Sequence, residues 1–118
     1  DKVIFTGFLT ESEVNSVYRM ADVYVMPSVS EPFGITTLEA MNNGTPVIIS
    51  RQSGVSEIVN HCLKVDFWDI NQIASKIISV VRYNELKECL VENSSNEVMR
   101  FSWDTSAKRC IEVYQKCL

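Results

Sequence analysis

The order of apolar and polar residues divides the chain into a first part with short apolar runs and a last part with helical spacing only. Four runs, rich in β-branched residues, lie at residues 3–5, 23–26, 46–50 and 62–65, the last of them the weakest. These runs do not alternate with polar residues. They therefore predict buried strands of a parallel sheet with helices on both faces.

Helical spacing fills the segments between these runs. Residues 10–20 predict a helix that begins with a capping box formed by Thr10 and Glu13. Residues 35–43 predict a second helix, which Gly44 is well placed to end, and a short helix is expected near residues 55–60. Strands separated by helices about one crossover long are typical of α/β proteins with a parallel sheet.

After residue 69 the apolar positions follow helical spacing alone. Three helices are predicted, around Ile70, Leu86 and Ala107, with Ser102 as the N-cap of the last one. A chain of 118 residues that is 46% hydrophobic can bury one core. The fold class is therefore α/β, with a Rossmann-like parallel sheet of about four strands flanked by helices, in a single domain or a large piece of one.

One segment at the carboxyl ends of the strands, where ligands bind in open parallel sheets, combines two acidic residues with a helix start. Glu31 and Glu39 are separated by seven residues, and Pro32 and Gly34 interrupt regular structure between them. The helix that follows exposes free N–H groups and the positive end of its dipole, which suits a phosphate. Glu39, one turn into that helix, can accept hydrogen bonds from the paired hydroxyls of a ribose.

Composition and charge argue against a nucleic-acid-binding protein and against a membrane-spanning one. The balance of 11 basic against 15 acidic residues gives a net charge of −4, spread along the chain, so nucleic acid is not expected as a partner. The apolar runs are too short to span a bilayer and no signal segment opens the chain. We expect a cytoplasmic protein, or one at the periphery of a membrane.

The four cysteines have no metal-binding spacing. None forms a Cys-x-x-Cys pair, and the only histidine, His61, adjoins just Cys62. The sequence therefore predicts free thiols in a reducing compartment, without a metal site or a disulfide framework. Two groups of large side chains are read as packing residues: Trp68 and Trp103 in the core or between domains, and Met20, Met26 and Met41 in the core.

Six segments, in this order, resemble the C-terminal half of GT-B fold glycosyltransferases of group 1, the GT4 family. They are Val3-Ile4-Phe5-Thr6-Gly7, Ala21 to Ser28, Glu31-Pro32-Phe33-Gly34 through Met41, Gly44-Thr45-Pro46-Val47-Ile48, Gly54 to Val59, and Phe101-Ser102-Trp103. The resemblance covers nearly the whole chain. It implies a retaining hexosyltransferase that uses a nucleotide-diphosphate sugar as substrate, with no cofactor and no metal.

The resemblance also assigns donor-binding residues. By position, Glu39 would bind the ribose hydroxyls, and the N–H groups of Gly34, Ile35 and Thr36 would meet the diphosphate or the donor sugar. The backbone of Phe33 would line the same site.

Glu31 is the candidate catalytic residue. It would lie near the sugar ring and stabilise positive charge at the anomeric carbon, because an oxocarbenium-like transition state is cationic. This role does not require Glu31 to be a nucleophile.

Two departures from the family pattern are features that residues 1–118 are expected to lack. The Arg/Lys pair that neutralises the departing diphosphate and the acceptor-binding N-terminal domain would precede residue 1, so residues 1–118 are expected to be a truncated donor-binding half that transfers no sugar alone. In the family's strand order two strands would be missing between residues 3–5 and residues 23–26, so either a compact four-stranded rearrangement or an edge-paired dimer is expected. In addition, Asn60-His61-Cys62 stands where the family has a glycine, so that loop is expected to differ.

Two other functions remain compatible with the sequence. One is a non-catalytic sugar-nucleotide binding or assembly module of the same fold, and a more distant one is a nucleotide-sugar isomerase on the same scaffold. The donor base, the sugar and the acceptor depend on details of the pocket and on the missing half.

Overall fold

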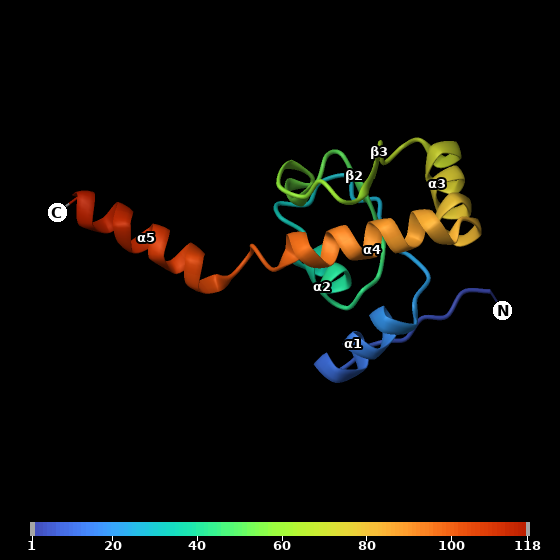
Figure 1. Ribbon diagram of the computed structural model, residues 1–118, viewed down its shortest axis with the longest axis horizontal. Helices are drawn as coiled ribbons and strands as arrows, with labels where there is room; N and C mark the ends of the chain where they lie inside the picture. Colours follow the sequence, from blue (N-terminus) through green and yellow to red (C-terminus); the bar gives the residue numbers. More distant parts are fainter. Residues whose placement is uncertain (1, 118) are drawn as a thin grey trace.

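The computed structural model describes residues 2–117, which form three strands, five α-helices and one short 3-10 helix (Figure 1). The elements follow in the order α1 (Glu11–Met20), β1 (Tyr24–Met26), α2 (Ile35–Asn42), β2 (Val47–Ser50), η1 (Gly54–Glu57), β3 (Leu63–Val65), α3 (Ile70–Arg82), α4 (Asn84–Val98) and α5 (Trp103–Cys117). Each helix predicted from the sequence is present, and so are three of the four strands.

The sheet is parallel, with strand order β1-β2-β3. Val25 pairs with Ile48, and Ile48 pairs with Leu63, so β2 is the central strand. Val47 and Ile49 belong to the main apolar cluster, whereas Ile48, between them, is buried outside it. Since alternate residues of a strand point to opposite faces, the sheet is covered on both faces, as predicted.

The strand predicted at residues 3–5 is absent. Val3, Ile4 and Phe5 are 74%, 84% and 95% exposed and form no strand. An isolated strand has no partner for its N–H and C=O groups, and within the described residues this segment pairs with no strand. The prediction of a compact four-stranded arrangement is therefore wrong, whereas the edge-paired dimer stays a prediction.

The helix α2 lies at the centre of the helical packing. It contacts α1, α4, β1 and β2, and α3 covers β2 and β3. Ala40 and Met41 of α2 are completely buried against the sheet, as is Val55 of η1. The packing therefore fixes the orientation of α2, and with it the helix N-terminus that the sequence marked as the ligand site.

Three helix-end predictions are confirmed. The Thr10 N–H and hydroxyl both donate to the Glu13 carboxylate, at 2.8 and 2.7 Å. The Gly44 N–H closes the end of α2 by donating to the Met41 carbonyl at 3.1 Å. The Ser102 hydroxyl accepts the Thr105 N–H at 3.1 Å at the start of α5.

The helix α5 extends away from the body of the molecule (Figure 1). None of its residues is buried, and Trp103 is 80% exposed. Trp68 and Met20 are also exposed, at 62% and 78%. The prediction of core packing is therefore wrong for these three side chains, because no element of the described chain covers them. Packing of the two tryptophans between domains stays a prediction, and Met26 is buried as expected.

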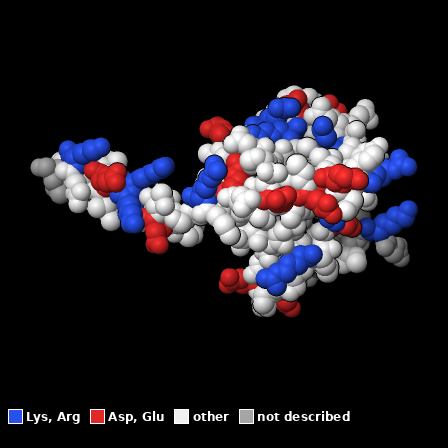
Figure 2. All heavy atoms as spheres, viewed as in Figure 1, with Lys and Arg blue, Asp and Glu red and all other residues white. Residues whose placement is uncertain are grey.

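Charged side chains of both signs interleave on the face shown in Figure 2. Acidic side chains lie along α4, which carries the exposed residues Glu85, Glu88 and Glu92, while α5 carries both signs. In the described part of the chain, no helix is long and apolar enough to cross a membrane.

A buried carboxylate holds the loop before β3, where the sequence departs from the family pattern. Glu97 of α4 is 5% exposed. It accepts the backbone N–H groups of Asn60 (2.9 Å) and His61 (2.8 Å), the Asn60 side-chain amide (3.2 Å) and the His61 Nδ1 (3.0 Å). Burial alone would raise the pKa of Glu97, but the hydrogen bonds from His61 and Asn60 outweigh it and lower the pKa.

Candidate functional site

The loop that carries Glu31 is fixed against the loop that follows β2. The Gly54 N–H donates to the Glu31 carbonyl at 2.9 Å, and the Val55 N–H donates to the Phe33 carbonyl at 2.6 Å. A Cβ atom on Gly54 would overlap the Pro32 carbonyl oxygen, so only glycine permits this approach. Two loops at the carboxyl ends of neighbouring strands are thus held together as one edge.

Gly34 turns this loop into α2. Its φ angle is 97°, in the left-handed region, and a Cβ atom there would lie only 3.0 Å from both the Met26 Cε and the Val55 Cγ1. The residue is buried, whereas Ile35 and Thr36, the next two, are exposed. The turn needs glycine both for its dihedral angle and for its lack of a side chain.

The start of α2 has free hydrogen-bond donors. Within residues 2–117, the N–H groups of Gly34, Ile35 and Thr36 have no acceptor, and Gly34, the N-cap, provides no side-chain cap. A helix start in this state carries partial positive charge and N–H groups that suit an anion. The structure thus brings the predicted donor-binding residues together at one helix end.

The two glutamates lie around a pair of tyrosines. Glu39 is exposed on α2, and its Oε2 accepts the Tyr18 hydroxyl at 3.3 Å. Glu31 is half-buried, and its Oε1 accepts the Phe33 N–H at 3.3 Å. Burial raises the pKa of Tyr24, and the nearby charges of both Glu31 and Glu39 raise it further, although the Tyr24 bond to Thr36 acts in the opposite direction. Both carboxylates therefore act on the same tyrosine.

The tyrosines themselves are ordered by contacts with each other and with α2. Their rings meet edge to face, with centroids 5.7 Å apart. The Tyr24 hydroxyl lies 2.8 Å from the Thr36 Oγ1 in a hydrogen bond. Burial, followed by the neighbouring Tyr24 and Glu39, raises the pKa of Tyr18 to about 12.

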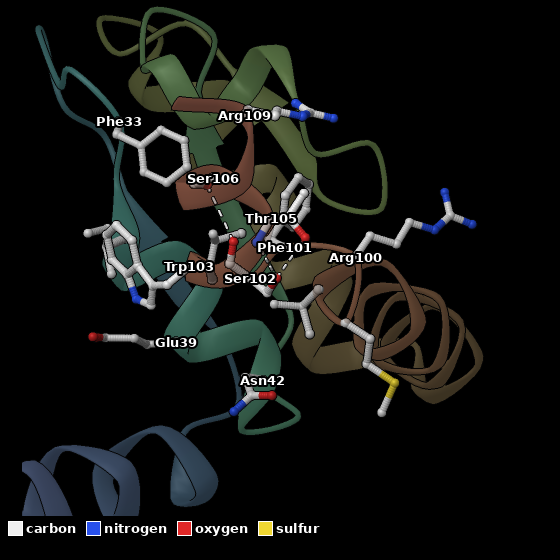
Figure 3. A pocket seen from close by; sticks show the side chains of 14 residues that line it. Phe33, Glu39, Asn42, Arg100, Phe101, Ser102, Trp103, Thr105, Ser106 and Arg109 are labelled. Atoms are coloured by element: carbon white, nitrogen blue, oxygen red, sulfur yellow. Dashed lines mark hydrogen bonds between the residues drawn. The ribbon is translucent and has the colours of Figure 1, made fainter. Parts of the chain in front are cut away.

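A cavity of about 640 Å³ borders the outer face of α2. It is formed by α2 residues such as Ile35 and Glu39, by Phe33, and by the segment from Val98 to Arg109 (Figure 3). In Figure 3, Glu39 projects from α2 away from Arg100 and Arg109. Across residues 2–117 neither Glu31 nor Glu39 forms an ion pair, and the start of α2 supplies partial positive charge near them.

Metal binding and histidine chemistry have no geometric support in the described residues. No three His, Cys, Asp or Glu side chains there gather as a metal site. The His61 ring bonds to Glu97, in the loop before β3, and takes no part in the glutamate site. The absence of a metal requirement stays a prediction.

Three features of the site were missed by the sequence reasoning. Tyr18 and Tyr24 were given no role in the site, and Gly54 was named only as the start of a segment that resembles the family. For Tyr18 a signal exists, because the hydroxyl of a tyrosine on a core-facing position needs a polar partner. No comparable signal marks Gly54, whose constraint arises from a loop more than twenty residues earlier.

Comparison with protein-family models matches residues 1–97 to the family described as glycosyl transferases group 1. The chain is 39% identical, over 97% of its length, to an uncharacterized glycosyltransferase of Methanocaldococcus jannaschii. The sucrose-phosphate synthase of Thermosynechococcus elongatus has a similar structure, with a TM-score of 0.88 and 31% identity over 99% of the chain.

A third similarity concerns the fold alone. The HepE protein of Anabaena, solved in complex with UDP-glucose, superposes with a TM-score of 0.79 at 20% identity over 88% of the chain. The chain spans 30% of the length of each of these three proteins.

Proposed function

The chain belongs to the group 1 family of glycosyl transferases, and on that premise we propose that it is the donor-binding half of a retaining transferase. The proposed reaction moves a sugar from a nucleotide-diphosphate donor to a glycan, a lipid or another acceptor. A preceding domain of the same protein would bind that acceptor.

The observation that carries this proposal is the position of Glu39 relative to the start of α2. The free N–H groups of residues 34–36 suit a diphosphate. Glu39 lies a few residues further along the helix, roughly 7 Å at 1.5 Å per residue. This separation is comparable to that between the diphosphate and the ribose hydroxyls of a nucleotide, so one helix can bind both groups.

Glu31 precedes the start of α2 in the chain, and we assign it to the reacting end of the donor. Its Oε1 is held by the Phe33 N–H, and its backbone is held by Gly54. A carboxylate fixed in this way stabilises positive charge that develops at the anomeric carbon without needing to reorient. The proposed role is electrostatic and includes hydrogen bonds to the sugar hydroxyls.

The departing diphosphate needs more positive charge than α2 supplies. No Lys or Arg occurs between Pro27 and Gly44, and Arg51 is the nearest basic residue in the neighbouring loop. We therefore place the cations that neutralise the leaving group in the preceding domain, together with the acceptor site. Closure of the two halves would exclude water from the cleft and align the reactants.

The test is a titration of the complete protein with a panel of nucleotide-diphosphate sugars, followed by transfer assays with the donors that bind. Glu92→Gln, an exposed position on α4, serves as a matched control because it removes a glutamate outside the site. Donor binding and transfer that survive in this control, together with transfer that is lost in Glu31→Gln, support the proposal. Donor binding without transfer to any acceptor would favour a binding module, and no binding by any donor would contradict both functions.

A further inference from the structure

Tyr18 is the one side chain of α1 that donates a hydrogen bond to the Glu39 carboxylate on α2. Its hydroxyl donates to the Glu39 Oε2 at 3.3 Å, across 21 residues of sequence. The residue is 8% exposed, although Glu39 itself is exposed. The hydroxyl of the buried Tyr18 thus donates to the carboxylate of the exposed Glu39.

The position of the Tyr18 ring is determined by its surroundings. The ring meets Tyr24 edge to face at 5.7 Å between centroids, and it belongs to the main apolar cluster. The Tyr18 backbone carbonyl accepts the Thr45 hydroxyl at 2.5 Å. Because the Tyr18 backbone and ring are both fixed by these contacts, the Tyr18 hydroxyl has a defined position next to Glu39.

We propose that Tyr18 is a positioning residue for the donor nucleotide: it fixes one oxygen of Glu39 so that the other oxygen faces the ribose hydroxyls. This inference rests on the proposed function and extends it to a residue outside the loop and helix that carry Glu31 and Glu39. A glutamate side chain has three rotatable bonds, and a carboxylate that is already oriented loses less conformational freedom when the ribose binds.

The hydrogen-bonding chemistry of the pair suits this role. A tyrosine hydroxyl can donate to one carboxylate oxygen, which leaves the lone pairs of the second oxygen for other donors. Burial raises the pKa of Tyr18 to about 12, so the hydroxyl keeps its proton across the neutral range and donates throughout. The ribose hydroxyls then donate to the free oxygen of a carboxylate whose orientation is fixed.

The test compares Tyr18→Phe with two control variants of the complete protein. Phenylalanine keeps the ring and its contact with Tyr24 and removes only the hydroxyl. Tyr83→Phe removes a hydroxyl from an exposed tyrosine between α3 and α4 and is expected to change nothing. Glu39→Ala, alone and combined with Tyr18→Phe, removes the acceptor of the Tyr18 hydroxyl and shows whether the two side chains act together.

Calorimetry measures the affinity for a nucleoside diphosphate and for its 2′,3′-dideoxy counterpart. We expect Tyr18→Phe to weaken binding of the nucleoside diphosphate about 3- to 10-fold. Binding of the dideoxy compound should not change, and Tyr18→Phe should cause no further loss when Glu39 is already alanine. A purely structural role for Tyr18 would instead weaken both ligands equally.

Three results would overturn the inference. These are an unchanged affinity of Tyr18→Phe for the nucleoside diphosphate, an equal loss for both ligands, or independent effects of Tyr18→Phe and Glu39→Ala. The ratio of the two affinities remains informative even if Tyr18→Phe lowers stability, because both ligands report on the same folded protein. If the unmodified protein binds no nucleoside diphosphate, the proposed function fails as well. If the unmodified protein binds it and Tyr18→Phe binds it equally well, only the inference about Tyr18 fails.

Discussion

Replacement of Glu97 should destabilise the fold strongly, because this carboxylate is the acceptor for four N–H groups of the loop before β3. Two of them are backbone N–H groups, of Asn60 and His61, and two belong to their side chains. Glu97 also lies in the last turn of α4, where the helix dipole disfavours negative charge. The hydrogen bonds therefore have to outweigh both burial and the dipole.

The magnitude follows from what each variant leaves unpaired. Glu97→Ala frees two backbone N–H groups, which cost about 1–3 kcal/mol each when buried. Asn60 and His61 are exposed, so water can reach part of the freed groups, and the sum falls to roughly 2–4 kcal/mol. Glu97→Gln keeps one acceptor oxygen and removes the unfavourable charge at the helix end, so about 1–2 kcal/mol is expected.

Urea denaturation followed by circular dichroism measures these differences, with Glu92→Ala on the exposed face of α4 as the control. Surface substitutions of this kind usually change the free energy of unfolding by less than about 0.5 kcal/mol. A loss below about 1 kcal/mol for Glu97→Ala would refute the reasoning. It would show that water replaces the carboxylate at little cost.

The pH dependence provides a second readout of the same interaction. The pKa of Glu97 is lower in the folded chain than the ordinary value of 4.5, so its contribution to stability is present above that value. As the pH falls below 4.5 toward the folded pKa, protonation removes this contribution. Glu97→Gln should therefore lose less stability than the unmodified chain over the same acidic range.

Three further predictions concern the site. Gly34→Ala should cost about 1–3 kcal/mol of stability and weaken nucleotide binding, because the φ angle of 97° at Gly34 and the 3.0 Å approach to Met26 and Val55 leave no place for a Cβ atom. A melting temperature and a nucleotide affinity equal to those of the unmodified protein would contradict this. Glu31→Gln in the complete protein should lower turnover while the affinity for a nucleoside diphosphate, which lacks the sugar, stays nearly intact, and a parallel loss of that affinity would exclude the proposed role. The purified 118-residue chain should bind nucleoside diphosphates weakly, if at all, and transfer no sugar; transfer that disappears in Glu31→Gln prepared in the same way would show that the chain is active alone.

The elements that could be predicted from the sequence are those whose pattern is local. The central strand β2 is predicted by an uninterrupted apolar run. The helix α2 is predicted by the glycines at its two ends, Gly34 and Gly44, and both elements lie where they were expected. Residues 3–5 have an equally good strand pattern but form no strand, because pairing depends on neighbouring strands and not on the segment itself.

The same distinction explains which site residues were found. Glu31 and Glu39 are marked by their spacing around a helix start, which is a local signal. The bond from Tyr18 to Glu39 and the overlap of Gly54 with the Pro32 carbonyl arise from contacts between elements far apart in the chain. Their roles depend on how α1 packs on α2 and how one loop packs on another, so they became visible only in three dimensions.

The most direct test of the central claim is the affinity of the complete protein for nucleoside diphosphates with and without the Glu39 carboxylate. Calorimetry of Glu39→Ala should show a loss of about 1–3 kcal/mol, or roughly 5- to 150-fold in Kd, because an acceptor of the ribose hydroxyls is lost from an exposed helix position. Thermal stability should change only through the Tyr18 hydroxyl, which loses its acceptor in the same variant. Glu92→Ala should bind as the unmodified protein does. An unchanged affinity of Glu39→Ala would contradict the account by removing Glu39 from the nucleotide site.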